Sequence, residues 1–475
     1  MVRTRGKRGR PCGARLVGFL LAAAFAAGCR ATNDTPKPTA PTHPVLLIGM
    51  DGLEWGTVLR MSASGRLPAL AALMEKGSFG ALEVTKPTLS PILWTSIATG
   101  TTSGKHGIRG FVHGEQKTTS GGGRSARLYT SNDRRVKAFW NIVSDAGRRV
   151  HTIGWWLTYP VERVNGVMVA QVNTVTPRMR RAGQGIWKGQ LVEGLSGQVH
   201  PPEREPAILS MIPEVTAEAP GLVRAIFGAV PDGVEKAPAE MLEQSAWAFR
   251  ADALYHRVAL EVLHDDSPFD LFAVYFGGAD VVGHRFWRHA YPELYRHPPA
   301  GDEQRTFGHI LEAYYSYLDT IVAGLIAAAP PDANILVVSD HGMDPVRRNG
   351  RFRMPALSGG HLTGPPAVLI AAGPDIRKSE RAATAVGAGD VERIGSILDV
   401  TPTMLTLLGI PIGRDMDGDV IRTLLTEELL ERRPVRYVSA HTERGWFDNR
   451  PKPAVADDNA SERIEQLRAL GYLTE

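Results

Sequence analysis

Four short runs along the chain are apolar at almost every position, which is the pattern of strands buried on both faces. Segments whose apolar residues repeat at helical spacing lie between these runs. Strands that alternate with helices predict an α/β fold with a parallel central sheet. The predicted strands are 45–50, 270–278, 334–340 and 366–373, and the predicted helices are 67–76, 238–264 and 307–329.

The segment 175–235 interrupts this alternation. It is rich in Gly and Pro and has no strand pattern, so we expect an insertion over one end of the sheet, with outer limits at about 175–260. Near the C-terminus, Ile464, Leu467 and Leu470 have helical spacing. This spacing predicts a terminal helix within an extension that covers residues 426–475.

The first 28 residues have the pattern of an export signal. Six basic residues accompany the apolar run 16–27, which is too short for a comfortable membrane span. The run ends in AAGC, which resembles a bacterial lipoprotein signal. We expect cleavage before Cys29, a membrane anchor through a lipid on Cys29, a flexible tether over 29–44, and a place in the cell envelope, periplasmic or on the outer surface. Simple cleavage and an uncleaved anchor are the alternatives.

Composition places the chain among globular proteins, with 43% hydrophobic and 22% charged residues. The net charge of +4 depends on the leader, because residues 1–28 hold six basic residues and no acids, and their removal leaves about −2. We therefore expect no nucleic-acid-binding surface. Cys12 lies in the leader and Cys29 would carry the lipid, so the mature chain has no thiols to pair.

Three of the predicted strands deliver an aspartate at or just beyond their carboxyl ends, which is the edge where parallel α/β sheets bind ligands. One such aspartate is usually a turn or cap residue, but three, two of them with a histidine nearby, are harder to explain in that way. Another histidine, His361, follows two glycines in a loop. The residues are Asp51, then Asp280 with His284 four positions later, then Asp340 beside His341.

Carboxylate oxygens and imidazole nitrogens together suit zinc. Since the mature chain has no thiolates, a closed structural zinc site is unfavourable, and the pattern favours a catalytic site with an open position. A second candidate for chemistry lies in the stretch KPTLSPILWTSIATG, residues 86–100, which is rich in hydroxyl groups. Its local pattern predicts a helix with Ser90 as the cap and Pro91 as the first helical residue.

In chain order, the motifs MDG, PTLSPILWTSIATG, GKHGI, ADVVGH, SDHGMD and GGH resemble those of the alkaline phosphatase superfamily. The resemblance is closest to its type I phosphodiesterase and nucleotide pyrophosphatase branch, and it extends from about Val45 to Val420. It implies an alkaline phosphatase-like three-layer sandwich over residues 45–425, with a mostly parallel central sheet and an inserted cap region.

The resemblance also implies a reaction centre. Ser90 aligns with the nucleophile, which also contacts the second metal ion, and Thr88 is a minor candidate for the same role. The implied ligands are Asp280, His284 and His361 for one zinc ion and Asp51, Asp340 and His341 for the other.

The implied reaction is hydrolysis of phosphodiester or nucleotide pyrophosphate bonds in a small phosphoester or nucleotide, through a covalent phosphoseryl intermediate. Two zinc ions about 4 Å apart can activate the nucleophile and stabilise the leaving oxygen. A phosphomonoesterase of the same superfamily is the first alternative. An envelope lipoprotein that keeps the fold without the activity is the second. A sulfatase is disfavoured, because Ser90 is followed by PILW and lacks an arginine four residues later.

The chain departs from the branch at Phe111, where an asparagine commonly holds a phosphoryl oxygen. Arg109 and Lys105 are candidate replacements, although a basic loop residue is usually just solvated. Trp155, Trp156 and Tyr159 could line a substrate pocket, with core packing the better expectation for at least one of them. We expect His106 to be structural, and Asp344, Asp415 and Asp417 to be turn residues.

Overall fold

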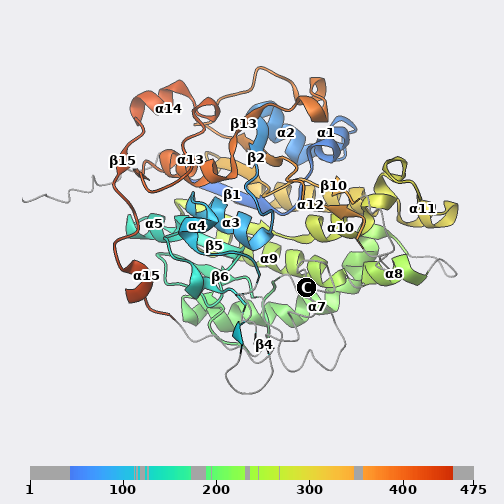
Figure 1. The fold of residues 1–475 in the computed structure, drawn as a ribbon, viewed down its shortest axis with the longest axis horizontal. Helices are drawn as coiled ribbons and strands as arrows, with labels where there is room; N and C mark the ends of the chain where they lie inside the picture. Colours follow the sequence, from blue (N-terminus) through green and yellow to red (C-terminus); the bar gives the residue numbers. More distant parts are fainter. Residues whose placement is uncertain are drawn as a thin grey trace, which may run out of the picture. The chain divides into compact units, whose positions relative to one another are not determined.

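The computed structural model describes residues 43–452, except for 112, 114–115, 118–123, 126–127, 173–188, 194, 230–235, 244, 267 and 347–356 (Figure 1). The expected leader, Cys29 with its expected lipid, nearly all of the expected tether and the predicted terminal helix lie outside the described residues.

A nine-stranded sheet organises the described part of the chain, in the strand order β13-β2-β12-β9-β1-β8-β5-β6-β7. At its centre, β1 (Val45–Met50) pairs in parallel with β8 (Leu271–Phe276) and with β9 (Asn334–Val338). The sequence prediction of these three strands is confirmed. The others are β2 (Ser78–Glu83), β5 (Val150–Trp155), β6 (Met168–Ala170), β7 (Val199–His200), β12 (Ala367–Ala372) and β13 (Arg393–Ser396).

The direction of one predicted strand was wrong. We expected 366–373 to be a parallel strand, whereas β12 runs antiparallel to both β9 and β2. The apolar run of β12 reflects burial on both faces, and burial carries no information about strand direction. The sheet is therefore mostly, but not wholly, parallel.

Helices cover both faces of the sheet, because successive side chains of β1 enter different cores. Leu46, Ile48 and Met50 belong to one core, and Val45 and Leu47 to the other. The first core is covered by α1 (Trp55–Ala63), α2 (Pro68–Lys76), α9 (Ala246–Asp265), α10 (Gly278–Ala290) and α12 (Ile310–Ala328). The second is covered by α3 (Ser90–Thr99), α5 (Phe139–Asp145), α13 (Val400–Leu407) and α14 (Glu427–Arg432). This gives the predicted three layers.

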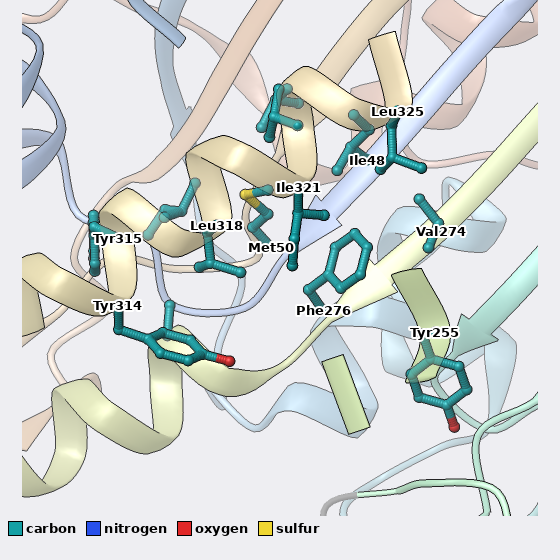
Figure 2. Close-up of a cluster of buried hydrophobic side chains, with 14 of the residues drawn as sticks. Ile48, Met50, Tyr255, Val274, Phe276, Tyr314, Tyr315, Leu318, Ile321 and Leu325 are labelled. Carbon is teal, nitrogen blue, oxygen red and sulfur yellow. The ribbon is translucent and has the colours of Figure 1, made fainter. Parts of the chain in front are cut away.

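Figure 2 shows the first core, where Leu318 and Ile321 of α12 lie against Met50 of β1 and Phe276 of β8. Burying each such side chain contributes about 1.5–3 kcal/mol. The helical stretch Gly301–Ala328 is apolar and long enough to cross a membrane by length and composition alone. Its packing in this core accounts for that composition.

Two of the predicted helices are confirmed as α2 and α12, while the third is divided. The range 238–264 contains α8 (Lys236–Glu243) and most of α9. Between them, Ser245 directs its backbone N–H to Leu242 O and its hydroxyl to Met241 O. A serine that bonds to the local backbone in this way competes with helix continuation.

The predicted insertion contains a long helix that the sequence pattern did not reveal. Helix α7 (Glu205–Phe227) continues through Pro213 and Pro220 and packs against α9 and α12. Each proline removes one helical N–H, which is why the pattern argued against a helix. The insertion itself, with its limits at about 175–260, stays a prediction. The remaining short elements are α4 (Ser103–His106), α11 (Gly301–Phe307), α15 (Trp446–Asn449), β3 (Gln116–Lys117), β4 (Arg124–Ser125), β10 (Asp344–Pro345), β11 (Gly359–Gly360), β14 (Ile412–Gly413) and β15 (Tyr437–Val438).

A largely buried carboxylate ties the C-terminal part of the chain to the sheet. Glu162 accepts hydrogen bonds from Arg134 at 2.7 Å, from Trp140 Nε1 at 2.8 Å and from Arg450 at 2.9 Å. Burial opposes ionisation of Glu162, but the charges of Arg134 and Arg450 outweigh it and lower the pKa of the carboxyl below its ordinary value. The Arg134 side chain is only 2% exposed, so it depends on this partner.

The substitution Glu162→Gln should lower the free energy of unfolding by about 3 kcal/mol at pH 7, because it leaves Arg134 buried without its counter-charge. A depressed carboxyl pKa gives stability that is fully present above about pH 4.3 and is lost as the pH falls through the folded-state pKa. The difference from the native protein should therefore shrink below about pH 4. Urea unfolding of both proteins at several pH values measures this difference in unfolding free energy.

The matched control is Glu427→Gln, which removes the same charge from an exposed pair with Arg377. We expect a loss of less than about 1 kcal/mol there. Equal losses at the two positions would contradict the role given to Glu162.

Candidate metal centre and nucleophile

The three central strands end at one edge of the sheet. The register pairs Met50 of β1 with Phe276 of β8, and Gly49 of β1 with Val338 of β9. Beyond these ends the chain supplies Asp51, the start of α10, and the Asp340–His341 pair. Because the strands pair in parallel without a large shift in register, side chains that are up to 290 residues apart in sequence come together.

Six side chains that the sequence singled out form two groups at this edge. Within each group, one oxygen or nitrogen atom per residue lies within 4.8 Å of the others. All six residues are buried. Their types, carboxylate and imidazole, could hold a divalent metal ion in each group. One group is Asp280, His284 and His361, and the other is Asp51, Asp340 and His341.

The two groups adjoin. His341 Nε2 lies 3.3 Å from Asp51 Oδ1, 3.5 Å from Asp340 Oδ2 and 3.9 Å from Asp280 Oδ1 of the other group. The rings of His341 and His361 are stacked with their centroids 3.7 Å apart. Burial lowers the pKa of His341, but Asp340 and Asp51 outweigh it and raise that pKa above its ordinary value. The site therefore attracts positive charge.

Backbone carbonyls orient two of the histidines. His284 Nδ1 lies 2.8 Å from Gly359 O, and His341 Nδ1 lies 2.8 Å from Gly342 O. A ring that donates through Nδ1 presents the lone pair of Nε2, which is the atom that faces the carboxylates here. His284 Nε2 lies 3.1 Å from Asp280 Oδ1, one helical turn earlier in α10, as the spacing of four predicted.

The glycine of the MDG motif has a steric role. Gly52 has φ +73°, and a Cβ atom there would lie 3.0 Å from Asp280 Cα. Any other residue would strain the turn after β1 and press on the start of α10. Gly52 thus lets Asp51 and Asp280 approach one another.

Ser90 is the first residue of α3 and is 1% exposed. Its Oγ makes no hydrogen bond to any described residue. The prediction that Ser90 is the cap was wrong by one position. The cap residue is Leu89, Ser90 is the first helical residue and Pro91 is the second. Such a difference is within the usual uncertainty of helix ends. Four residues further on, Trp94 Nε1 donates to Asp51 Oδ2 at 3.2 Å, so the start of α3 lies beside the edge that carries the carboxylates.

The candidate phosphate-binding residues differ in their surroundings. Lys105 Nζ pairs with Asp417 and donates to Asp415 O at 2.7 Å, whereas Arg109 is exposed. Phe111 is buried edge-on against Trp156, with ring centroids 6.0 Å apart. An apolar ring at this position cannot donate to a phosphoryl oxygen.

The other aromatic candidates are core residues. Trp155, Trp156 and Tyr159 are at most 4% exposed, as expected for core packing. His106 is structural as predicted, because its ring contacts Ser96 Oγ at 3.1 Å. Burial, aided by the charge of Arg134, lowers the pKa of His106 to about 3, so this imidazole is neutral.

Sequence reasoning missed Asp252, which holds the start of α10. Its carboxylate accepts the N–H groups of Gly277 at 2.9 Å and Gly278 at 3.0 Å and the hydroxyl of Tyr314 at 2.6 Å. Burial raises the pKa of Asp252 to about 6 against the opposing effect of these hydrogen bonds. The available signal was an aspartate in an otherwise apolar face of α9.

Replacing Asp252 by Ala should leave the N–H groups at the start of α10 without their acceptor. We expect faster amide hydrogen exchange in peptides that cover 276–284, and a loss of unfolding free energy of about 3 kcal/mol. Mass spectrometry of exchanged, digested protein measures the first effect, and urea unfolding the second.

Asp319→Ala is a matched control, because Asp319 accepts the N–H groups of Ala69 and Leu70 at the start of α2, both at 2.9 Å. It should cost similar stability and leave exchange in 276–284 unchanged. Unchanged exchange there in Asp252→Ala would show that Asp252 does not hold α10.

Comparison with known proteins identifies the family of the chain. The sequence profile of the type I phosphodiesterase / nucleotide pyrophosphatase family matches residues 45–365. A comparison with curated proteins gave no match.

The described fold is also similar to solved structures. Phosphonoacetate hydrolase from Sinorhizobium meliloti 1021 is 18% identical with a TM-score of 0.38, over 66% of this chain and 59% of that one, which is under two thirds of its length. Human ectonucleotide pyrophosphatase / phosphodiesterase 5 is 13% identical with a TM-score of 0.44, over 81% of this chain and 100% of that one. The alkaline phosphatase PafA is 10% identical with a TM-score of 0.49, over 82% and 99%.

Proposed function

Because the chain belongs to the type I phosphodiesterase / nucleotide pyrophosphatase family, we propose that it is a metal-dependent phosphohydrolase that cleaves phosphodiester or nucleotide pyrophosphate bonds. The observation that carries the proposal is the pair of buried carboxylate and imidazole groups beside the start of the helix that begins at Ser90. We propose two divalent cations as cofactors, with zinc preferred by this set of oxygen and nitrogen donors.

The residues present fit these ions. Three buried aspartates around the imidazole of His341 are unfavourable unless positive charge lies among them. The two carbonyl-bonded imidazoles present Nε2, a good zinc ligand, to those aspartates. When bound, the cations lower the pKa of a coordinated hydroxyl and stabilise charge on a leaving oxygen.

Ser90 supplies the attacking oxygen. Its Oγ forms a bond to phosphorus as the bond from phosphorus to the leaving oxygen breaks, and the proton lost by the hydroxyl is balanced by the one that the leaving oxygen takes up. Water then attacks the phosphoseryl group, restores the serine hydroxyl and releases the second product. Burial of Ser90 excludes bulk water from the first step, since only 1% of the residue is exposed.

We propose a diester rather than a monoester as the preferred substrate. A phosphodiester carries one negative charge, whereas a monoester carries nearly two at neutral pH. Binding a dianion calls for further cationic groups or donors. Of the three positions considered for that role, Lys105 is paired with Asp417, Arg109 is exposed and Phe111 is apolar.

We expect Ser90→Ala to lose activity by about a thousandfold or more while keeping its metal, because the attacking oxygen is gone but all six carboxylate and imidazole residues remain. The assay is release of nitrophenol from bis(4-nitrophenyl) phosphate, with metal content measured by elemental analysis. Thr88→Ala, which removes a neighbouring buried hydroxyl, is the control and should keep most of the activity.

Full activity in Ser90→Ala would exclude this serine as the nucleophile. The same assay with 4-nitrophenyl phosphate separates the subclasses, since faster turnover of the monoester would favour a phosphomonoesterase. A native protein with neither metal nor turnover would favour a lipoprotein without enzymatic activity.

We also propose that the enzyme is exported and held at the membrane by a lipid on Cys29. The motif AAGC after an apolar run of twelve residues supports this location. In that place the active site would meet phosphoesters outside the cytoplasm.

Cys29→Ser should move the protein from the membrane fraction to the soluble fraction, because the lipid would be its anchor. Immunoblots of fractionated cells measure the distribution. Cys12→Ser is the control, since Cys12 would be removed with the leader and should not affect it. Membrane retention of the Cys29 variant would rule out anchoring by this residue.

A further inference from the structure

One oxygen of Asp51 is held by two aromatic side chains. Asp51 Oδ2 accepts a hydrogen bond from the Tyr275 hydroxyl at 2.7 Å and from Trp94 Nε1 at 3.2 Å. The other oxygen, Oδ1, lies 3.3 Å from His341 Nε2. The carboxylate is therefore oriented, with one oxygen directed to donors in the core and the other to the imidazole of its metal-binding group.

The two donors come from different elements and support one another. Tyr275 is on β8 and Trp94 is on α3, and their rings meet edge to face with centroids 5.0 Å apart. Trp155 of β5 packs on Trp94 at 5.1 Å and donates its indole N–H to Trp94 O at 3.3 Å. Tyr275, Trp94 and Trp155 are each 2% exposed or less, so packing fixes the two rings that donate to Asp51.

The sequence of β1 makes room for this arrangement. A Cβ atom on Gly49 would lie 2.8 Å from the Trp94 ring, which is closer than carbon atoms approach. Gly49 lies in β1, two residues before Asp51, which follows the end of the strand. The absence of a side chain at Gly49 thus leaves room for the indole of Trp94, which donates to the carboxylate of Asp51.

We propose that Tyr275 and Trp94 are positioning residues of the metal centre, which occupy Asp51 Oδ2 so that Oδ1 is directed to the cation. Trp94 has a second effect, because it lies one helical turn after Ser90 and so links the nucleophile's helix to a metal ligand. This inference rests on the proposed two-metal function, and it adds residues that contact neither metal nor substrate.

The test uses the full chain and the variants Tyr275→Phe and Trp94→Phe, which remove one donor each and keep an aromatic ring. Zinc affinity is measured by competition with a chromophoric chelator. We expect one zinc equivalent to bind about tenfold more weakly in each variant, with the other equivalent unchanged. In the double variant the loss should be larger, because Oδ2 would then be buried without either donor.

Kinetics separate the two roles. At saturating zinc, Tyr275→Phe should regain nearly the native kcat, because metal occupancy is its only defect. Trp94→Phe should keep a lowered kcat at the same zinc concentration, because the start of α3 is no longer tied to Asp51. The KM for the diester should change little in both variants.

Two control variants lose the same chemical groups elsewhere in the core. Tyr255→Phe removes a buried hydroxyl that donates to Ala170 O at 3.0 Å, and Trp140→Phe removes an indole N–H that donates to Glu162. Both should lower stability and leave zinc affinity unchanged. They report the effect of a merely structural loss.

Native zinc affinity in both test variants would overturn the positioning role while leaving the proposed function intact. Full recovery of kcat in Trp94→Phe at saturating zinc would overturn the link between Trp94 and Ser90. A native protein that bound no metal at all would overturn the proposed two-metal site, and this inference with it.

Discussion

Parallel pairing of β1 with both β8 and β9 is the constraint on which the site depends. Asp51 directly follows β1, Asp340 lies two residues beyond β9, and Asp280 lies in the first turn of α10 after β8. The register of the three strands therefore sets the relative height of these aspartates. A strand pair shifted by two residues would move a carboxylate by nearly 7 Å and separate the groups. The apolar side chains of these strands fix the register by packing in the two cores. They therefore determine indirectly where the carboxylates lie.

Burying three carboxylates in the interior raises the free energy of the folded protein. Neighbouring residues provide the space and the hydrogen bonds that allow this arrangement. Gly52 permits the close approach of Asp51 and Asp280, and Gly49 gives Trp94 access to Asp51. Asp252 holds the start of the helix that carries two of the six residues. These supporting residues are buried and lie on separate elements, so the geometry of the site is a property of the whole sheet edge.

The sequence predicted the elements with strong periodicity and the site residues with motif context. Strands β1, β8 and β9 follow from their continuous apolar runs, and helix α12 follows from apolar residues at helical spacing, because burial imposes these patterns. The direction of β12 did not follow, because an apolar run shows burial and not strand direction. The existence of α7 did not follow either, because its two prolines lower the helix propensity of the segment. Asp252 was missed because its role depends on a contact with a distant segment. The proposed ligands and Ser90 were named from the sequence, and the structure brings them to one place without testing what they bind.

The same supporting contacts bear on how charge is handled in the proposed reaction. The start of α3 offers fewer donors than a typical helix terminus, because Pro91 has no N–H and the N–H of Ile92 already donates to Leu89 O. The helix dipole still favours an anion there, but it supplies only a fraction of a charge. Neutralisation of a bound phosphoryl group would then fall mainly to the two proposed cations, one of which Asp51 would help to hold. In this arrangement both aromatic donors would act on one cation through the carboxylate of Asp51, and Trp94 would also connect that carboxylate to the helix of Ser90.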